Sequence, residues 1–166
     1  MARNNPVFPD EYRAFVLKCW RYSYAPWLDS ARLHALAMLV SEATEYLDNP
    51  SDDEAGDIVW ATEALAAAYG LPPLQTESDA VVPRGMLSRG VSSAAQSCQK
   101  IAQGGAFDAW LPQLAEALES VRNIALADRA QSIIMGNMEK LTLRYNGAAY
   151  NAAADAARLD KLEATE

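Results

Sequence analysis

Apolar residues recur every three or four positions along most of this chain, which is the period of a helix with one buried face. The pattern predicts helices over about 10–20, 29–48 and 51–70. Helical patterns then cover 86–103 and resume at Asp108, and the last strong helix ends near Tyr145. No segment shows the alternation typical of a β-strand, so the predicted fold class is all-α.

Proline and glycine mark the ends of several of these helices. Asn49-Pro50 breaks the chain because the residue before a proline is disfavoured in the helical region. Gly70 followed by Pro72-Pro73 is a typical stop signal, and residues 72–83 are predicted to form a linker. The expected organisation is a polar arm over 1–9, one domain over 10–147 and an alanine-rich, charged tail over 148–166.

The predicted helix over 29–48 is apolar on both sides, which is typical of a buried helix. One stripe contains Leu33, Leu36, Ala37, Val40, Thr44 and Leu47, and the other contains Ala31, Ala35, Met38, Leu39 and Tyr46. Glu42 lies within the second stripe, and Glu45 lies at its margin. Because an unpaired carboxylate in a buried position is costly, we expect both side chains to have a partner.

The next helix supplies Glu54 and Asp57, which are again three residues apart and therefore project from one side of it. The short connection between the two helices predicts an antiparallel hairpin. Counted from its bend, Glu45 is level with Glu54, and Glu42 is level with Asp57 one turn further in. Gly56 would let backbones approach closely here. The hairpin offers no cation to neutralise these four acids, and hard oxygen ligands of this kind suit Mg²⁺ or Mn²⁺.

Three of the four acids also have an interpretation without metal. Ser51-x-x-Glu54 fits a capping box, and acids in a first turn are favoured by the helix dipole. Glu42 and Glu45 would face water if their helix were less buried. Asp57 lies too far into its helix to act as a cap, and the same spacing occurs on both sides of one bend. Taken together, the four acids favour a metal site.

A second candidate site lies on the last predicted helix, whose apolar stripe is formed by Ile134, Met138, Leu141 and Tyr145. Asn137, Lys140 and Arg144 follow a neighbouring face at i, i+3 and i+7. An amide, an ammonium and a guanidinium in one row suit the binding of a polyphosphate. The alternative is that the two cations only compensate the negative end of the helix. Beside an acidic metal cluster, phosphate binding is the favoured interpretation.

These motifs resemble those of the MazG-like all-α nucleoside triphosphate pyrophosphohydrolases. Glu42-Ala-Thr-Glu45 followed by Glu54-Ala-Gly-Asp57-Ile-Val-Trp looks like the ExxE…ExxD signature of that family. Asn137-Met-Glu-Lys140-Leu-Thr-Leu-Arg144-Tyr145-Asn-Gly resembles its NxxKLxxRY phosphate-binding helix, and Asp10-Glu-Tyr-Arg-Ala-Phe resembles its first helix. The resemblance covers most of residues 10–147.

The resemblance implies the reaction (d)NTP + H₂O → (d)NMP + PPi. The four acids of the hairpin would hold two or more Mg²⁺ ions, for which Mn²⁺ would substitute, and the ions would activate a water for attack at the α-phosphorus. Glu42 or Glu45 would accept the proton of that water. Asn137, Lys140 and Arg144 would neutralise the phosphates that leave as pyrophosphate. The resemblance also implies a homodimer or homotetramer, and it favours a purine deoxynucleotide such as dGTP.

Residues 87–130 look like a degenerate copy of residues 36–69. Gly90-Val-Ser-Ser93-Ala-Ala-Gln96 aligns with Leu39-Val-Ser-Glu42-Ala-Thr-Glu45, and Glu116-Ala-Leu-Glu119 aligns with Glu54-Ala-Gly-Asp57. The copy lacks the first acid pair and would hold metal poorly. It is expected to form a second hairpin that completes a four-helix bundle and helps to shape the substrate pocket, with Lys100 as a further phosphate contact. Coincidence among alanine-rich helices explains the likeness equally well.

An aromatic stretch between the first two helices offers candidates for stacking on a nucleobase. These candidates are Trp20, Tyr22, Tyr24 and Trp27. The alternative, that such residues belong to the core or to an oligomer contact, is the more common one.

The charge balance restricts the partners of this chain. Its formal net charge of −8, from 22 acidic and 14 basic residues, argues against binding to a nucleic acid polymer, which needs clustered lysine and arginine. The longest apolar stretch, Ala35–Val40, is far below the ~20 residues that a membrane helix needs. The first residues show no secretory signal, and Cys19 and Cys98 are read as reduced thiols. The expected location is the cytoplasm of a bacterium or of a phage-infected host cell.

Two alternative functions stay open at this point. One is a dUTPase-like pyrophosphatase with the same acidic hairpin, and the other is a non-enzymatic helical interaction module whose acids form a docking face. The single histidine, His34, excludes most zinc sites and does not supply the Glu-x-x-His pairs of a di-iron bundle.

Overall fold

The computed structural model confirms the all-α fold class. It describes residues 9–22, 25, 27–75, 83–145, 150 and 153, and within these ranges it contains helices and no strand. The α-helices are α1 (Pro9–Cys19), α2 (Asp29–Asp48), α3 (Asp52–Ala68), α4 (Leu87–Ala102), α5 (Phe107–Leu126) and α6 (Ala130–Arg144), and a 3₁₀-helix, η1 (Arg84–Met86), precedes α4. Of the predicted arm and tail, only Pro9, Tyr150 and Ala153 lie within the described residues.

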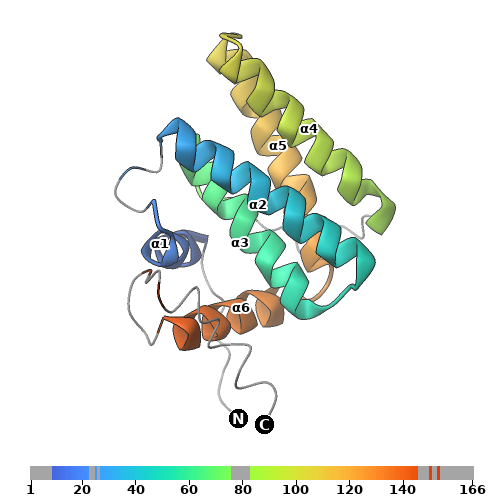
Figure 1. Cartoon of the computed structure of the whole chain (residues 1–166). Helices are drawn as coiled ribbons and strands as arrows, with labels where there is room; N and C mark the ends of the chain where they lie inside the picture. Colours follow the sequence, from blue (N-terminus) through green and yellow to red (C-terminus); the bar gives the residue numbers. More distant parts are fainter. Residues whose placement is uncertain are drawn as a thin grey trace.

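The predicted antiparallel hairpin is formed by α2 and α3, which lie side by side (Figure 1). Ser51 caps α3, because its side chain accepts a hydrogen bond from the backbone N–H of Glu54 at 3.2 Å. The turn is therefore fixed by Pro50 and by this cap, which satisfies one of the backbone donors at the start of α3. The N-terminal acids of α3 are thereby held beside the last turns of α2.

The second hairpin, α4 with α5, packs beside the first through contacts of α3 with α5 and of α2 with α4 (Figure 1). A Cβ on Gly90 would come within 2.6 Å of a methyl carbon of Val121, so this glycine permits the close packing of α4 on α5. The predicted four-helix arrangement is thus present. The internal repeat stays a hypothesis, because the aligned residues do not occupy matching positions in their helices. Ser93 lies in the first half of α4, whereas Glu42, with which it aligns, lies in the second half of α2.

The central element is α3, which packs against α1, α2, α5 and α6. Its residues from Ile58 to Ala66 are all buried. The last helix, α6, lies across the end of the hairpin from which α3 begins (Figure 1). It is separated from α5 by a turn at 127–129, in which Ala127 adopts a φ of +47°. Neither glycine nor proline marks this turn in the sequence.

The expectation that α2 is buried on both sides is wrong. The stripe with Ala31, Ala35 and Leu39 faces the core, but Leu33, Val40 and Leu47 of the other stripe are 70%, 45% and 41% exposed. The cause is that α2 is an outer helix, covered on one side by α3 and in part by α4. An apolar row therefore lies on the surface of this chain, and the homodimer or homotetramer stays a prediction.

The sequence also predicted no membrane span. Among the described residues, no helix combines the length and the apolar character needed to cross a bilayer.

Candidate metal and phosphate site

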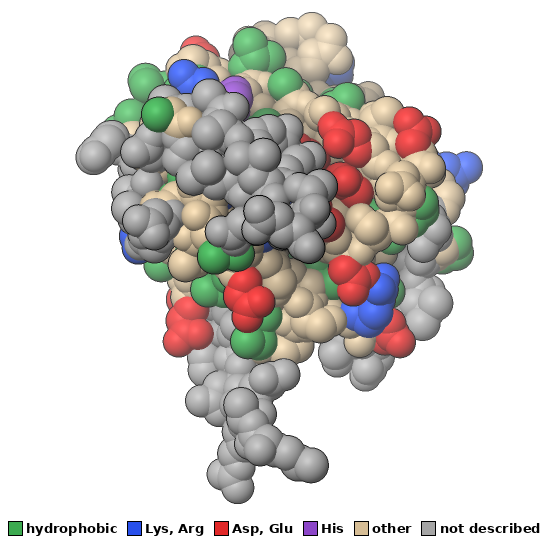
Figure 2. All heavy atoms as spheres, turned by 60° about the horizontal axis from the view of Figure 1, so that its bottom comes forward, with side chains coloured by type: hydrophobic (Ala, Val, Ile, Leu, Met, Phe, Trp, Pro, Cys, Tyr) green, Lys and Arg blue, Asp and Glu red, His purple; other side chains and the backbone are tan. Residues whose placement is uncertain are grey.

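Three of the four predicted metal ligands meet between α2 and α3. Glu42, Glu54 and Asp57 each place one carboxylate oxygen within 4.8 Å of the others, and all three side chains are half-buried. Glu45 is exposed and accepts a hydrogen bond from the hydroxyl of Ser41 at 3.3 Å, so it borders this acidic cluster without joining it. In Figure 2, a group of acidic side chains lies right of the centre, and other acidic side chains lie at the lower left and lower right of the same face.

Burial and mutual repulsion both oppose the negative charge of the cluster. Burial, with the neighbouring carboxylates of Asp57, Glu45 and Glu54, raises the pKa of Glu42 to about 7. Burial and then Asp57 raise the pKa of Glu54. Burial also raises the pKa of Asp57, although Lys140 works in the opposite direction. Three crowded carboxylates are therefore short of positive charge, and this set of hard oxygen donors fits a divalent cation such as Mg²⁺ or Mn²⁺.

Two of the predicted phosphate ligands contact the acidic cluster itself. The Nζ of Lys140 lies 2.6 Å from the Oδ1 of Asp57 and 2.8 Å from the Oδ1 of Asp53. The amide of Asn137 donates to the same Oδ1 of Asp57 at 3.2 Å. Burial works against the charge of Lys140, but Asp57 and Asp53 together raise its pKa. The sequence predicted that Asn137 and Lys140 bind phosphate. It did not predict that both side chains would contact the carboxylate of Asp57.

The position of Asn137 depends on two neighbours. A Cβ on Gly56 would lie 3.0 Å from the Cβ of Asn137, so the glycine lets α6 approach α3 closely at this point. The sequence predicted a close approach of backbones in the hairpin at Gly56, whereas the nearest atoms belong to the Asn137 side chain of α6. On the other side, the hydroxyl of Tyr12 donates to the Oδ1 of Asn137 at 3.0 Å. With its oxygen held by Tyr12, the amide turns its N–H towards Asp57.

We expect that Tyr12→Phe will weaken divalent-ion binding and largely preserve the fold. The ring keeps its packing against Arg122, whose guanidinium lies 5.4 Å from the ring centre, but Asn137 loses the donor that orients it. Outer-shell changes of this kind lower metal affinity by about 10–100-fold. Calorimetric titration with Mg²⁺ measures the change. Tyr69→Phe, which removes a buried hydroxyl at the other end of α3, is the matched control. An unchanged affinity for Mg²⁺ in Tyr12→Phe would show that Tyr12 serves packing alone.

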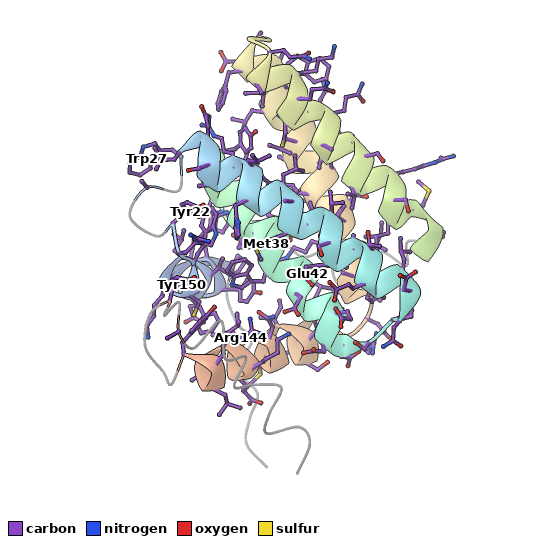
Figure 3. All side chains as sticks on the ribbon, in the orientation of Figure 1. Tyr22, Trp27, Met38, Glu42, Arg144 and Tyr150 are labelled. Carbon is purple, nitrogen blue, oxygen red and sulfur yellow. The ribbon has the colours of Figure 1, made fainter. Side chains whose placement is uncertain are left out.

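A pocket leads from the acidic cluster into the protein. Glu42 and Asp57 line it together with Arg144, and its volume is about 110 Å³, which is smaller than the roughly 300–1,000 Å³ typical of small-molecule sites. The remaining lining residues are Cys19, Trp20, Arg21, His34, Met38, Trp60, Leu141, Tyr145 and Tyr150. Figure 3 shows Met38 and Glu42 following one another along α2, with Arg144 on α6 and Tyr150 nearby. No residue of α4 or α5 lines this pocket, so the expectation that the second hairpin shapes it is wrong for the described residues.

The aromatic candidates separate into two groups. Trp20 is buried and lines the pocket, and the half-buried Tyr22 packs edge-on against it at 5.6 Å between ring centres. Trp27 is 61% exposed and lies away from the pocket (Figure 3), so its predicted role in base binding is not supported. Tyr24 lies outside the described residues. Trp60 lines the pocket as well and was missed, although it follows the second acid pair by one helical turn.

The structure does not bring Lys100 to this site. Its side chain is exposed in the last turn of α4, at the opposite end of the hairpins from the acidic cluster (Figure 1). The reason is that α4 runs antiparallel to α5 and ends beside the start of α2, whereas the acids lie near the end of α2.

A buried ion network beneath the site was also missed. The carboxylate of Glu63 pairs with the guanidinium of Arg122 at 3.1 Å and with that of Arg13, and the Glu63 and Arg122 side chains are each 1% exposed. Arg13 also donates to the backbone oxygens of Leu71 and Pro72. One signal was present in the sequence: Glu63 is the only charged residue between Ile58 and Ala68.

Comparison of this chain with protein-family models, with curated proteins and with solved structures finds no match. The resemblance to MazG-like enzymes therefore stays a prediction that depends on the motifs and on the site described above.

Proposed function

We propose that this protein is a metal-dependent nucleoside triphosphate pyrophosphohydrolase that converts a (d)NTP and water to a (d)NMP and pyrophosphate. The observation that supports this proposal best is the composition of one pocket. Glu42 and Asp57 of the acidic cluster, the guanidinium side chain of Arg144 and the indoles of Trp20 and Trp60 line the same space. Ligands for divalent ions, a cation for phosphate and aromatic surfaces for a base are the three requirements of a nucleoside triphosphate site.

The acidic cluster is the proposed metal centre. Glu42, Glu54 and Asp57 would hold Mg²⁺ or Mn²⁺, two or more ions in the full site, with Glu45 at its border. When bound, such ions supply charge neutralisation for the triphosphate and make a coordinated water more acidic. The Glu42 or Glu45 carboxylate would take up the proton that the attacking water loses. Asn137 and Lys140 would hold the Asp57 carboxylate in place.

The cations of α6 are the proposed phosphate ligands. Arg144 lines the pocket, and its planar guanidinium is suited to paired phosphate oxygens. Lys140 has three N–H donors, of which Asp57 and Asp53 take two, so one donor is left to reach a phosphate oxygen. Both residues would neutralise the pyrophosphate as it leaves.

The proposed substrate is a purine deoxynucleotide such as dGTP, in the cytoplasm of a bacterium or of a phage-infected cell. A dUTPase-like activity would use the same acids and differ only in the base. The non-enzymatic alternative, a helical interaction module, is less well supported because a docking face does not need acids, a cation and tryptophans around one pocket.

Incubation with each canonical dNTP and NTP, in Mg²⁺ or Mn²⁺, tests the proposal when pyrophosphate and orthophosphate are measured separately. We expect pyrophosphate and a nucleoside monophosphate in equal amounts, and no product once the ions are chelated. Release of orthophosphate alone would contradict cleavage between the α- and β-phosphates. No product from any nucleotide, together with no Mg²⁺ binding by calorimetry, would favour the interaction module.

A further inference from the structure

The ammonium of Lys140 is shared between two acids of α3 that differ in their surroundings. Its Nζ lies 2.6 Å from the Oδ1 of Asp57 and 2.8 Å from the Oδ1 of Asp53. Asp57 belongs to the acidic cluster, and its side chain is 22% exposed. Asp53 lies outside that cluster, and its side chain is 53% exposed. The sequence motifs gave Asp53 no role, so its contact with Lys140 needs an explanation.

The two acids hold the ammonium from neighbouring turns of one helix. Asp53 and Asp57 are four residues apart on α3 and therefore lie on the same side of it. Lys140 reaches them from α6, and its side chain is mostly buried. The Oδ1 of Asp57 also accepts a hydrogen bond from the amide of Asn137. Asp57 would thus keep a neutral donor that orients it if the ammonium moved onto Asp53.

A divalent ion at the acidic cluster would compete with the ammonium for Asp57. The ion carries two positive charges, and its repulsion of an ammonium grows as their separation falls. Lysine bears its charge on a flexible four-carbon stem, which lets the ammonium shift between neighbouring acceptors. Asp53 is such an acceptor, because it already contacts the ammonium and is open to solvent. Lys140 could therefore give up Asp57 and stay beside the site.

We propose that Asp53 is a positioning residue that acts through Lys140. It holds the ammonium at the edge of the site, so that Asp57 is left to a divalent ion and the other N–H donors of Lys140 are kept for the phosphates. This inference rests on the proposed function, because it needs an ion at the acidic cluster. Without Asp53, the ammonium would pair with Asp57 alone, and an ion would have to break that pair. Loss of Asp53 should therefore weaken metal binding.

Asp53→Asn tests this role, and Asp52→Asn is a closely matched control. Both acids lie in the first turn of α3, both side chains are 53% exposed, and each pairs with one basic side chain. The partner of Asp52 is Arg129. The two substitutions therefore remove the same charge from the same end of one helix, but only Asp53→Asn releases Lys140.

Calorimetric titration with Mg²⁺, without nucleotide, measures the effect of both substitutions. We expect Asp53→Asn to lower the affinity for Mg²⁺ by about tenfold, the lower limit for outer-shell changes at metal sites. Asp52→Asn should change the affinity little, as expected for the loss of a surface pair. Because both positions are exposed, the fold should survive either change. Equal affinities for Mg²⁺ in the two variants would overturn the inference.

A double-mutant cycle shows whether Asp53 acts through Lys140. Lys140→Met removes the ammonium and keeps an unbranched side chain. In that background, we expect Asp53→Asn to have little further effect on Mg²⁺ binding, because the cation that Asp53 holds is gone. An equal loss of affinity with and without the lysine would overturn the inference, since Asp53 would then act on the ion by its own charge.

The outcomes separate this inference from the proposed function. Mg²⁺ binding that Asp53→Asn leaves unchanged, with pyrophosphate released from a dNTP, would overturn the positioning role and leave the pyrophosphohydrolase standing. A loss of Mg²⁺ affinity that depends on Lys140, without pyrophosphate release from any canonical nucleotide, would support the positioning role and overturn the enzyme. Absence of Mg²⁺ binding by the original protein would overturn both the metal centre and the role of Asp53.

Discussion

Asp57→Asn is expected to lower pyrophosphate release by at least about a hundredfold, since even outer-shell changes at metal sites cost 10–100-fold. Asp57 is the residue that links the acidic cluster to the side chains of α6 and to the pocket. Its carboxylate belongs to the acidic cluster, accepts from both Lys140 and Asn137, and lines the pocket. The amide of asparagine keeps the shape of the side chain but removes the charge that would bind a divalent ion.

The fold of Asp57→Asn should survive. The raised pKa of Asp57 means that the folded protein disfavours its charge, so loss of that charge offsets part of the lost pairing with Lys140. Melting curves with and without Mg²⁺ show both effects together. Mg²⁺ should raise the melting temperature of the original protein, because a ligand that binds only the folded state stabilises it, and should not raise that of the variant.

Glu116→Gln is the matched control for this experiment. Glu116 is an exposed acid on α5, outside the acidic cluster, and its loss should leave both turnover and Mg²⁺ stabilisation unchanged. Full activity in Asp57→Asn would show that the acids have a structural role, and the proposed metal centre would then be wrong.

The largest expected loss of stability follows from Glu63→Gln. Glu63 neutralises Arg122 and Arg13 inside the protein, and burial already lowers the pKa of Arg122. Removal of one member of a buried ion pair leaves an uncompensated charge, which costs about 3–5 kcal/mol in the free energy of unfolding. Denaturant-induced unfolding, followed by circular dichroism, measures this difference.

The replacement of the whole network provides the control. The triple variant Glu63→Leu, Arg122→Met and Arg13→Met removes all three charges. We expect this variant to recover most of the stability that Glu63→Gln loses. A loss below about 1 kcal/mol for Glu63→Gln, as for a surface pair, would contradict the burial of this network.

The elements around the site could be predicted from local patterns. The ends of α2 and α3 follow from the period of apolar residues, from Pro50 and from the Ser51 cap, all of which act within a few residues. The i, i+3 spacing of Glu54 and Asp57 fixes a shared side of one helix whatever surrounds it. Two acids of α3 and Glu42 therefore meet as predicted once the hairpin forms.

Other features of the site depend on contacts between distant segments. The sequence alone could not decide which apolar stripe of α2 faces the core, because both stripes have the period of a buried face. The turn at 127–129 was not located, since Ala127 adopts its positive φ without the glycine that usually marks it.

What the sequence by itself determined is the set of helices, the acidic hairpin and the residue types available for chemistry, because these follow from spacing along a single helix. Only the tertiary structure decided that Lys140 and Asn137 hold Asp57, that Glu63 meets Arg122, and that Trp60 joins Trp20 beside the acids. These contacts depend on how α1, α5 and α6 cross α3, and such crossings are set by the packing of the whole core rather than by any local pattern.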